Sequence, residues 1–115
     1  MGARRVVKTA HTASYADPIR LAAGAEFALT GREDIWDGHR WLWAVAEDGR
    51  EGWIPDNLVR TVDGRPVAAH AYWAIELSCN AGDPVTLMSQ THGWGWCRSH
   101  DGAEGWLPLD KLRDG

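Results

Sequence analysis

The sequence has few cysteines, no long apolar run and no excess of positive charge. No stretch approaches the roughly 20 apolar residues that a membrane-spanning helix needs, so we expect no membrane partner. The net charge of −4 disfavours general nucleic-acid binding, because displacing counterions from phosphates needs a positive surface. Residues 1–8 precede no apolar segment, so no secretory signal is expected. We therefore expect a cytoplasmic protein whose Cys79 and Cys97 are buried, reduced thiols.

The chemistry-bearing residues also lack the groupings that catalysis needs. The histidines show no metal-ligand spacing, and no Cys-x-x-Cys pair accompanies them. No signature of a nucleophilic cysteine flanks Cys97 either. The sequence therefore predicts no metal, no cofactor and no enzymatic activity. The histidines are His11, His39, His70, His92 and His100.

Tryptophan is the abundant residue, with eight copies in 115 residues where random composition gives about one or two. An indole combines a large apolar body with one N–H donor, so it suits cores and half-exposed ligand platforms alike. Thirteen glycines indicate many tight turns. The tryptophans are Trp36, Trp41, Trp43, Trp53, Trp73, Trp94, Trp96 and Trp106.

An internal repeat organises the chain. Residues 41–60 and 94–113 align at a constant offset of 53, with nine of twenty positions identical. Residues 18–24 and 76–82 align at an offset of 58, so the first copy carries five extra residues between these two blocks. The extra residues fall within 30–40, a polar segment that predicts a longer loop. Two domains are therefore expected, at 1–62 and 68–115, with 63–67 as a short linker.

Each copy has the pattern of short antiparallel strands. Both rings of a Trp-x-Trp pair lie on one face of a strand, because strand side chains alternate. Asp48-Gly49 and Asp101-Gly102 predict tight type I′ hairpins, and Pro55 and Pro108 end the return strands because they lack an N–H. One 3₁₀ turn is expected after each proline, and no window has a sustained helical period. The sequence therefore predicts an all-β fold of two small, partly open barrels.

The second copy resembles a Src-homology-3 (SH3) domain through residues 71–83, Gly93-Trp94 and residues 105–108. The first copy is similar through Gly24, Trp41 and residues 52–59. Together the resemblance covers most of residues 5–113 and is strongest to the variant form found in bacterial proteins. It implies two SH3-like barrels in tandem that bind a protein or peptide and do not catalyse.

The resemblance also implies the binding residues. SH3 domains grip polyproline helices in an aromatic groove, where flat rings bury proline rings. The final groove tyrosine of the family is replaced here by Leu58 and Lys111. By position, the first groove would use Trp41, Trp53, Pro55 and Tyr15, and the second Trp94, Trp106, Pro108 and one of Tyr72 or Trp73.

Several of these aromatic residues also have a structural interpretation. Trp53 and Trp106 suit a groove or the cover of a small core equally well. For Trp43 and Trp96, sheet packing or contact between units is favoured. Trp36 is either an anchor for a partner or a plug against the neighbouring unit.

The acidic residues are read in the same two ways. Glu33, Asp34 and Asp37 fit a solvated loop better than a site for a basic ligand. Glu51 and Glu104 recur beside the hairpin turns, which favours cross-strand pairing over chemistry.

Three further functions remain open beside peptide binding. The first is a purely structural pair, in which the neighbouring barrel or a homodimer partner fills the grooves. Recognition of bacterial cell-wall peptidoglycan is the second alternative. The third is an aromatic cage for methylated amines, built on cation–π attraction.

Overall fold

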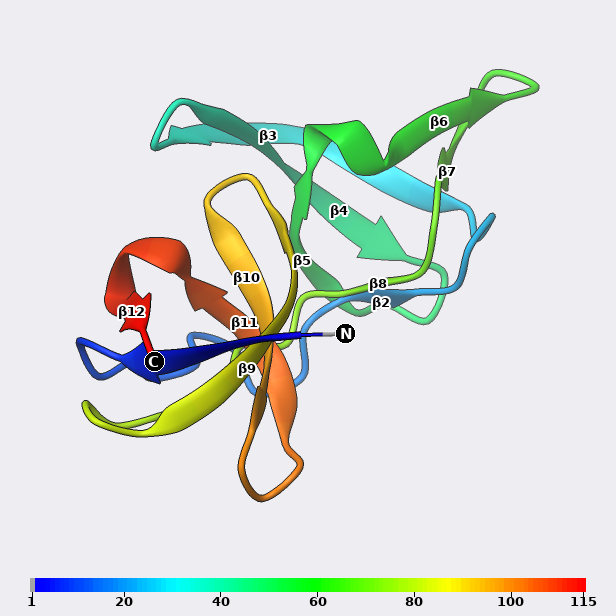
Figure 1. Cartoon of the computed structure of the whole chain (residues 1–115). Helices are drawn as coiled ribbons and strands as arrows, with labels where there is room; N and C mark the ends of the chain where they lie inside the picture. The colour runs from blue at the N-terminus through cyan, green and yellow to red at the C-terminus, as the bar shows by residue number, and fades with distance from the viewer. Residues whose placement is uncertain (1) are drawn as a thin grey trace. The chain divides into compact units, whose positions relative to one another are not determined.

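The computed structural model describes residues 2–115, which form twelve β-strands and two 3₁₀ helices and no α-helix. This confirms the predicted all-β class (Figure 1). None of the helices formed by these residues has the length and apolar character needed to cross a membrane. The chain divides into two compact units. We call residues 17–74 the inserted unit, and residues 2–16 together with 75–115 the split unit.

The split unit contains one continuous antiparallel sheet with the order β11-β10-β9-β1-β12. In Figure 1, β1 (blue) lies beside β9 (yellow) and β12 (red), so the first and last strands of the chain are neighbours. Outside the sheet, His11 and Cys79 pair through two backbone hydrogen bonds and join residues 8–16 to residues 75–83. The elements are β1 (Ala3–Val7), β9 (Pro84–Thr91), β10 (Trp94–Ser99), β11 (Glu104–Pro108), the 3₁₀ helix η2 (Leu109–Lys111) and β12 (Leu112–Asp114).

The inserted unit repeats this arrangement with its strands in a different chain order. Its sheet β3-β4-β5 corresponds to β9-β10-β11, and its hairpin β6-β7 corresponds to the pair β12-β1. Its short pair β2-β8 corresponds to the His11–Cys79 bridge. The elements are β2 (Arg20–Leu21), β3 (Phe27–Trp36), β4 (His39–Ala46), β5 (Glu51–Pro55), η1 (Asp56–Leu58), β6 (Val59–Val62), β7 (Arg65–Ala68) and β8 (Tyr72–Trp73).

The units therefore differ from the domains expected at 1–62 and 68–115. The first strand of the first repeat, β1, pairs with β9 and β12 of the second repeat. The first strand of the second repeat, β7, pairs with β6 of the first repeat, and Val67 bridges Glu26. Each sequence repeat thus donates its opening strand to the barrel completed by the other.

The turn between β6 and β7 explains this exchange. Asp63 and Gly64 have φ values of 51° and 76°, and two consecutive positive φ values define a type I′ turn. Such a turn folds β7 directly back onto β6, so residues 63–67 are a hairpin turn and strand rather than the expected linker. With β7 occupying that edge, β1 completes the split unit instead.

Other turns also differ from expectation. Asp48 and Asp101 do not have positive φ, so their hairpins are not the predicted type I′ turns. Instead Gly49 donates to the carbonyl of Ala46, and the side chain of Asp48 accepts from the amide of Arg50. The expected loop at 30–40 is mostly strand, because β3 continues to Trp36 and turns at Asp37-Gly38.

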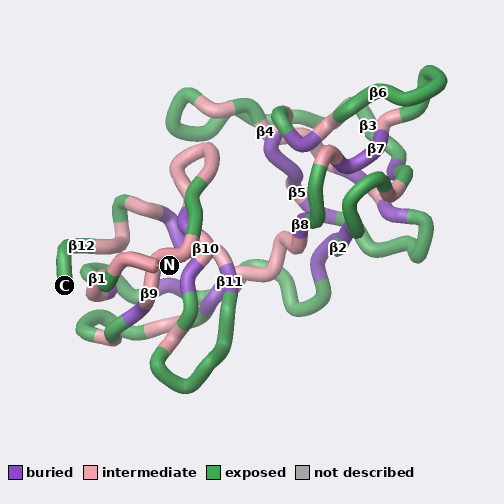
Figure 2. The backbone as a smooth tube through the Cα atoms, turned by 45° about the vertical axis from the view of Figure 1, so that its right-hand side comes forward, coloured by how far each residue is buried: buried purple, intermediate pink, exposed green. Residues whose placement is uncertain are grey.

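Each unit has its own apolar core, and in Figure 2 the buried segments lie along strands while most turns are exposed. The core of the split unit is Val7, Leu77, Val85, Cys97 and Leu107. Fully burying an aliphatic side chain stabilises a fold by about 1.5–3 kcal/mol, so β1 contributes substantially through Val7. The core of the inserted unit includes Ile19, Leu21, Phe27, Ala44, Ile54, Leu58, Val67 and Ala68.

Candidate binding faces

The same aromatic face recurs on the hairpin β4-β5 of the inserted unit and on β10-β11 of the split unit. Trp41 lies opposite Pro55 and Trp43 opposite Trp53 in one, and Trp94 opposite Pro108 and Trp96 opposite Trp106 in the other. Because side chains alternate along a strand, each set of four shares one face of its hairpin. The intervening residues, such as Ala44, Ile54, Cys97 and Leu107, are buried in the cores.

Within each face two indoles meet edge to face. The ring centroids of Trp43 and Trp53 are 5.0 Å apart at 82°, and those of Trp96 and Trp106 are 5.2 Å apart at 71°. This geometry places the positive edge of one ring against the negative face of the other. All four rings are half-buried. Their packed sides fix the geometry, and part of each ring stays accessible to a ligand.

A carboxylate fixes the outer indole of each pair. The indole N–H of Trp43 donates to Glu51 Oε1 at 2.8 Å, and that of Trp96 donates to Glu104 Oε1 at 2.9 Å. Arg98 also bonds Glu104 Oε2 at 3.3 Å, which agrees with the cross-strand pairing expected for this glutamate. A charge-assisted hydrogen bond of this kind restrains the ring that carries the donor.

The two prolines at the end of the faces are buried rather than exposed. Pro55 is among the largest fully buried side chains, and Pro108 is buried as well. Both lie opposite a tryptophan in the hairpin, Trp41 or Trp94, and offer little surface to a ligand.

The third side of each face comes from the arm, the segment that follows the exchanged strand: residues 8–16 after β1 and residues 69–74 after β7. Tyr72 belongs to the inserted unit with Trp41 and Trp53, and its hydroxyl donates to the carbonyl of Trp53 at 2.9 Å. Trp73 follows it in β8, with the Arg20 guanidinium 4.2 Å from its ring centroid. From the sequence, one of these two residues was expected in the second groove, together with Trp94.

Tyr15, expected with Trp41, belongs to the split unit and is 44% exposed. The exchange of β1 and β7 thus reassigns the arm residue of both grooves. The tryptophans and prolines of each groove stay together as expected.

His11 is a residue of this site that sequence reasoning missed. It is 9% exposed and meets Trp94 edge to face at 5.8 Å. It pairs with Cys79 as Tyr72 pairs with Leu21, so the two residues are structurally equivalent. Aligning residues 6–7 with residues 67–68 gives an offset of 61, which also aligns His11 with Tyr72. The offsets of 53 and 58 found elsewhere in the repeat do not reveal this match.

Charged groups flank the His11 ring on both sides. Nε2 is 2.7 Å from Glu76 Oε1, and Nδ1 is 2.9 Å from the Lys111 ammonium. Because an ammonium only donates, Nδ1 accepts and Nε2–H donates to the carboxylate. The His11 ring thus links Lys111, at the position of the family's groove tyrosine, to Glu76.

The extra residues of the first repeat carry further exposed side chains. Ile35 is 62% exposed and Trp36 37% exposed beside the Asp37-Gly38 turn. Glu33 pairs with Arg40 at 2.8 Å, and this arginine lowers the pKa of the glutamate. Glu33 is therefore already engaged within the hairpin.

The remaining chemistry-bearing side chains are the potential metal ligands and the two cysteines. Among residues 2–115, no three His, Cys, Asp or Glu side chains gather as a metal ion would require. Cys79 is half-buried and Cys97 fully buried, and both are free thiols. Burial raises the pKa of both thiols, that of Cys97 to about 11, so neither is a ready nucleophile.

The small barrels and their Trp-lined hairpins define an SH3-like fold. The family model for the variant SH3 domain matches residues 5–62, just over half of the chain. The chain therefore belongs to the variant SH3 domain family, whose members are generally non-catalytic interaction modules. No curated protein and no solved structure matches the chain significantly. The matched residues span both structural units, because β1 lies in the split unit.

Proposed function

We propose that the chain is a tandem interaction module that binds extended, proline-rich peptides through its two aromatic faces. The observation that carries this proposal is the recurrence of one face in both units, with the same register, an edge-to-face ring pair and an indole–carboxylate hydrogen bond. Core packing alone does not require half-exposed rings to be fixed by carboxylates in both copies.

The chemistry of the faces suits such a ligand. A polyproline helix is already extended and loses little conformational entropy on binding. Its rings pack flat on indoles, and an indole N–H bonds a peptide carbonyl. In this proposal the ligand packs on Trp41, Trp53 and Tyr72 in the inserted unit and on Trp94, Trp106 and His11 in the split unit, beside the buried Pro55 and Pro108.

The test is an NMR titration of the full chain with the indole N–H signals assigned. The ligand is a decaproline peptide, and the matched control replaces alternate prolines by alanine. We expect saturating shifts of the Trp41 and Trp94 indoles with decaproline and at least fivefold weaker binding of the control.

Two results would count against the proposal. Flat titrations would reject peptide binding, and sedimentation would then show whether the chain self-associates instead. Shifts seen only with soluble peptidoglycan fragments would replace the peptide with a cell-wall ligand.

A further inference from the structure

In the inserted unit, an arginine of the same chain occupies the corner between two tryptophans. The Arg32 guanidinium carbon lies 4.7 Å from the ring centroid of Trp43 and 4.9 Å from that of Trp53. Both distances are within the roughly 6 Å range of a cation–π contact. Because the two rings stand at 82° to each other, one guanidinium contacts both walls of a right-angled corner.

The backbone is built to place Arg32 there. In the pairing of β3 with β4, Leu29 lies opposite Ala44 and Glu33 opposite Leu42, so residues 30–32 bulge out across from Trp43. Gly31 has a φ of 89°, which favours glycine. The Thr30 hydroxyl accepts from the Arg32 amide at 3.2 Å and donates to the Trp43 carbonyl at 3.4 Å. The bulge is thereby tied to the strand that carries the ring.

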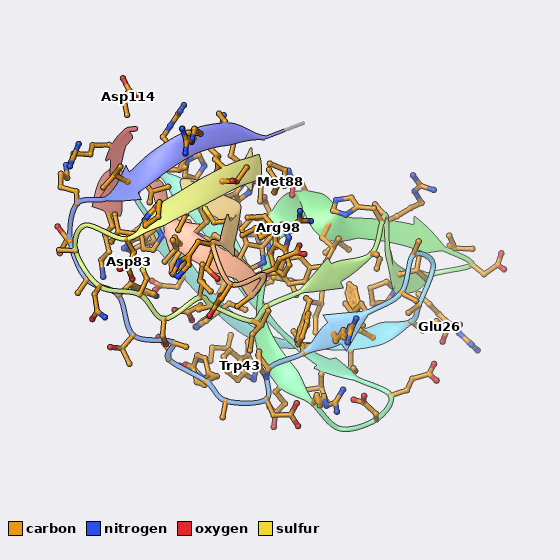
Figure 3. All side chains as sticks on the ribbon, turned by 60° about the horizontal axis from the view of Figure 1, so that its bottom comes forward. Glu26, Trp43, Asp83, Met88, Arg98 and Asp114 are labelled. Carbon is orange, nitrogen blue, oxygen red and sulfur yellow. The ribbon has the colours of Figure 1, made fainter. Side chains whose placement is uncertain are left out.

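The split unit differs at the same place. There Leu87 lies opposite Cys97 and Ser89 opposite Trp96, so the bulge is a single residue, Met88, and Trp96 has a register partner in β9, whereas residues 30–32 lie across from Trp43. Arg98 of that unit bonds Glu104, whereas the corresponding Val45 of the inserted unit is apolar. Trp43, Met88 and Arg98 are labelled in Figure 3. Between equivalent pairs the inserted unit therefore has three residues, 30–32, where the split unit has two, 88–89, so one of the five extra residues of the first repeat lengthens the bulge that carries Arg32.

We propose that the Trp43–Trp53 corner is a guanidinium-binding site that Arg32 occupies as an internal ligand, and that an arginine side chain of a peptide partner competes for it. A guanidinium is planar, always charged and weakly hydrated, so it stacks on indoles more readily than an ammonium does. Glu51 holds the Trp43 ring through its indole N–H and adds negative charge beside the corner. Because the Arg32 guanidinium already occupies the corner, we expect the competing group of a partner to be a guanidinium as well.

The internal arginine sets the threshold for binding. A tethered group competes as if present at millimolar concentration, so a partner arginine must exceed this effective concentration. Arg32 is itself exposed to solvent and its bulge carries no core residue. Removing its side chain therefore opens the corner and leaves both cores intact.

The test titrates N-acetyl-arginine amide into the full chain and follows the indole N–H signals of Trp43 and Trp53. We compare the wild type with Arg32→Ala and with Arg40→Ala, a control that removes the same charge from the same hairpin. In Arg32→Ala we expect both indoles to shift with at least fivefold tighter binding than in the wild type or the control. N-acetyl-lysine amide at equal ionic strength is expected to bind more weakly.

Equal curves in all three proteins, or shifts that avoid Trp43 and Trp53, would overturn the proposal. Arg32→Gln keeps most of the side-chain length without the charge, and it must behave as Arg32→Ala does. The inference rests on the proposed binding role only in taking the partner to be a peptide. Because the probe is a single arginine without proline, failure of decaproline binding leaves the result of this test unaffected.

Discussion

The indole–carboxylate pairs show how one glutamate can hold a large apolar ring at the protein surface. Trp43 and Trp96 each donate to a glutamate two positions before the second ring of the pair. The bond satisfies the only polar atom of the indole, so the ring remains at the surface without rotating away. We expected Glu51 and Glu104 to act in cross-strand pairing, and the structure adds the restraint of a tryptophan to that role.

Cys97 provides a test of burial through pH. Burial raises the pKa of its thiol to about 11, above the roughly 8.5 of an exposed thiol. A raised pKa stabilises the folded state fully below the unfolded value, and this stability is lost as the pH rises through the folded value. Cys97→Ala is expected to cost about 1 kcal/mol at pH 7, because it leaves a small cavity.

Between pH 9 and 11 the difference in unfolding free energy between wild type and Cys97→Ala should shrink. Urea unfolding followed by the Trp96 and Trp106 indole signals measures it, and other groups that titrate in both proteins cancel. Cys79→Ala, at a half-buried position, serves as the control. A difference that stays constant to pH 11 would contradict the burial of an unionised thiol.

A backbone segment that runs alongside each return strand explains the repeated Glu-Gly-Trp sequence. In the split unit, Leu77 donates to the Trp106 carbonyl at 3.0 Å and Trp106 donates to the Ile75 carbonyl at 2.9 Å. A Cβ on Gly105 would lie 2.6 Å from the Leu77 nitrogen. Only glycine therefore lets residues 75–77 run alongside β11.

Gly105→Ala is expected to destabilise the split unit by about 1–3 kcal/mol, because backbone atoms must shift to make room. The equivalent Gly52→Ala is the matched comparison, and its Cβ meets the Ile19 side chain at 2.9 Å before any backbone atom. We expect a smaller loss in the inserted unit. Unit-specific indole signals during urea unfolding report each effect. An equal loss of stability in both units would refute the role of residues 75–77 in requiring glycine.

Local sequence patterns were sufficient to predict most elements. Alternation and the Trp-x-Trp repeat located β4, β5, β10 and β11, and the residues after Pro55 and Pro108 formed the expected 3₁₀ turns. The turn types were wrong because a side-chain bond from Asp48 to the amide of Arg50 favours a wider loop than a two-residue turn. The bulge at residues 30–32 was not predicted, because a bulge is defined by the pairing with the neighbouring strand, here β4 with Trp43. The sequence of one strand alone does not show that pairing.

Because the opening strands are exchanged, each compact unit contains residues from both sequence repeats. β1 and β7 have similar sequences, Ala-Arg-Arg-Val-Val and Arg-Pro-Val-Ala, and both present apolar residues to a core. Their local patterns therefore predict a strand without specifying which barrel it completes. The choice depends on the Asp63-Gly64 turn and on pairing across more than one hundred residues, between β1 and β12. Such long-range pairing is not encoded in any local pattern, so the sequence did not reveal that Tyr15 lies in the split unit and Tyr72 in the inserted unit.

Engineered disulfides distinguish the exchanged from the unexchanged pairing in the full chain. Val6 lies opposite Arg113 in β12, and in an unexchanged barrel it would instead lie opposite the equivalent Arg60 of β6. Antiparallel neighbours have Cα atoms about 4.5–5.5 Å apart, within the range that a disulfide spans. With both native cysteines replaced by alanine, Val6→Cys/Arg113→Cys should oxidise within one chain, and Val6→Cys/Arg60→Cys should not. Peptide mass spectrometry after proteolysis identifies the linked residues. A 6–60 disulfide would contradict the exchange, and a 6–113 disulfide between two chains would show that a second copy supplies the strand.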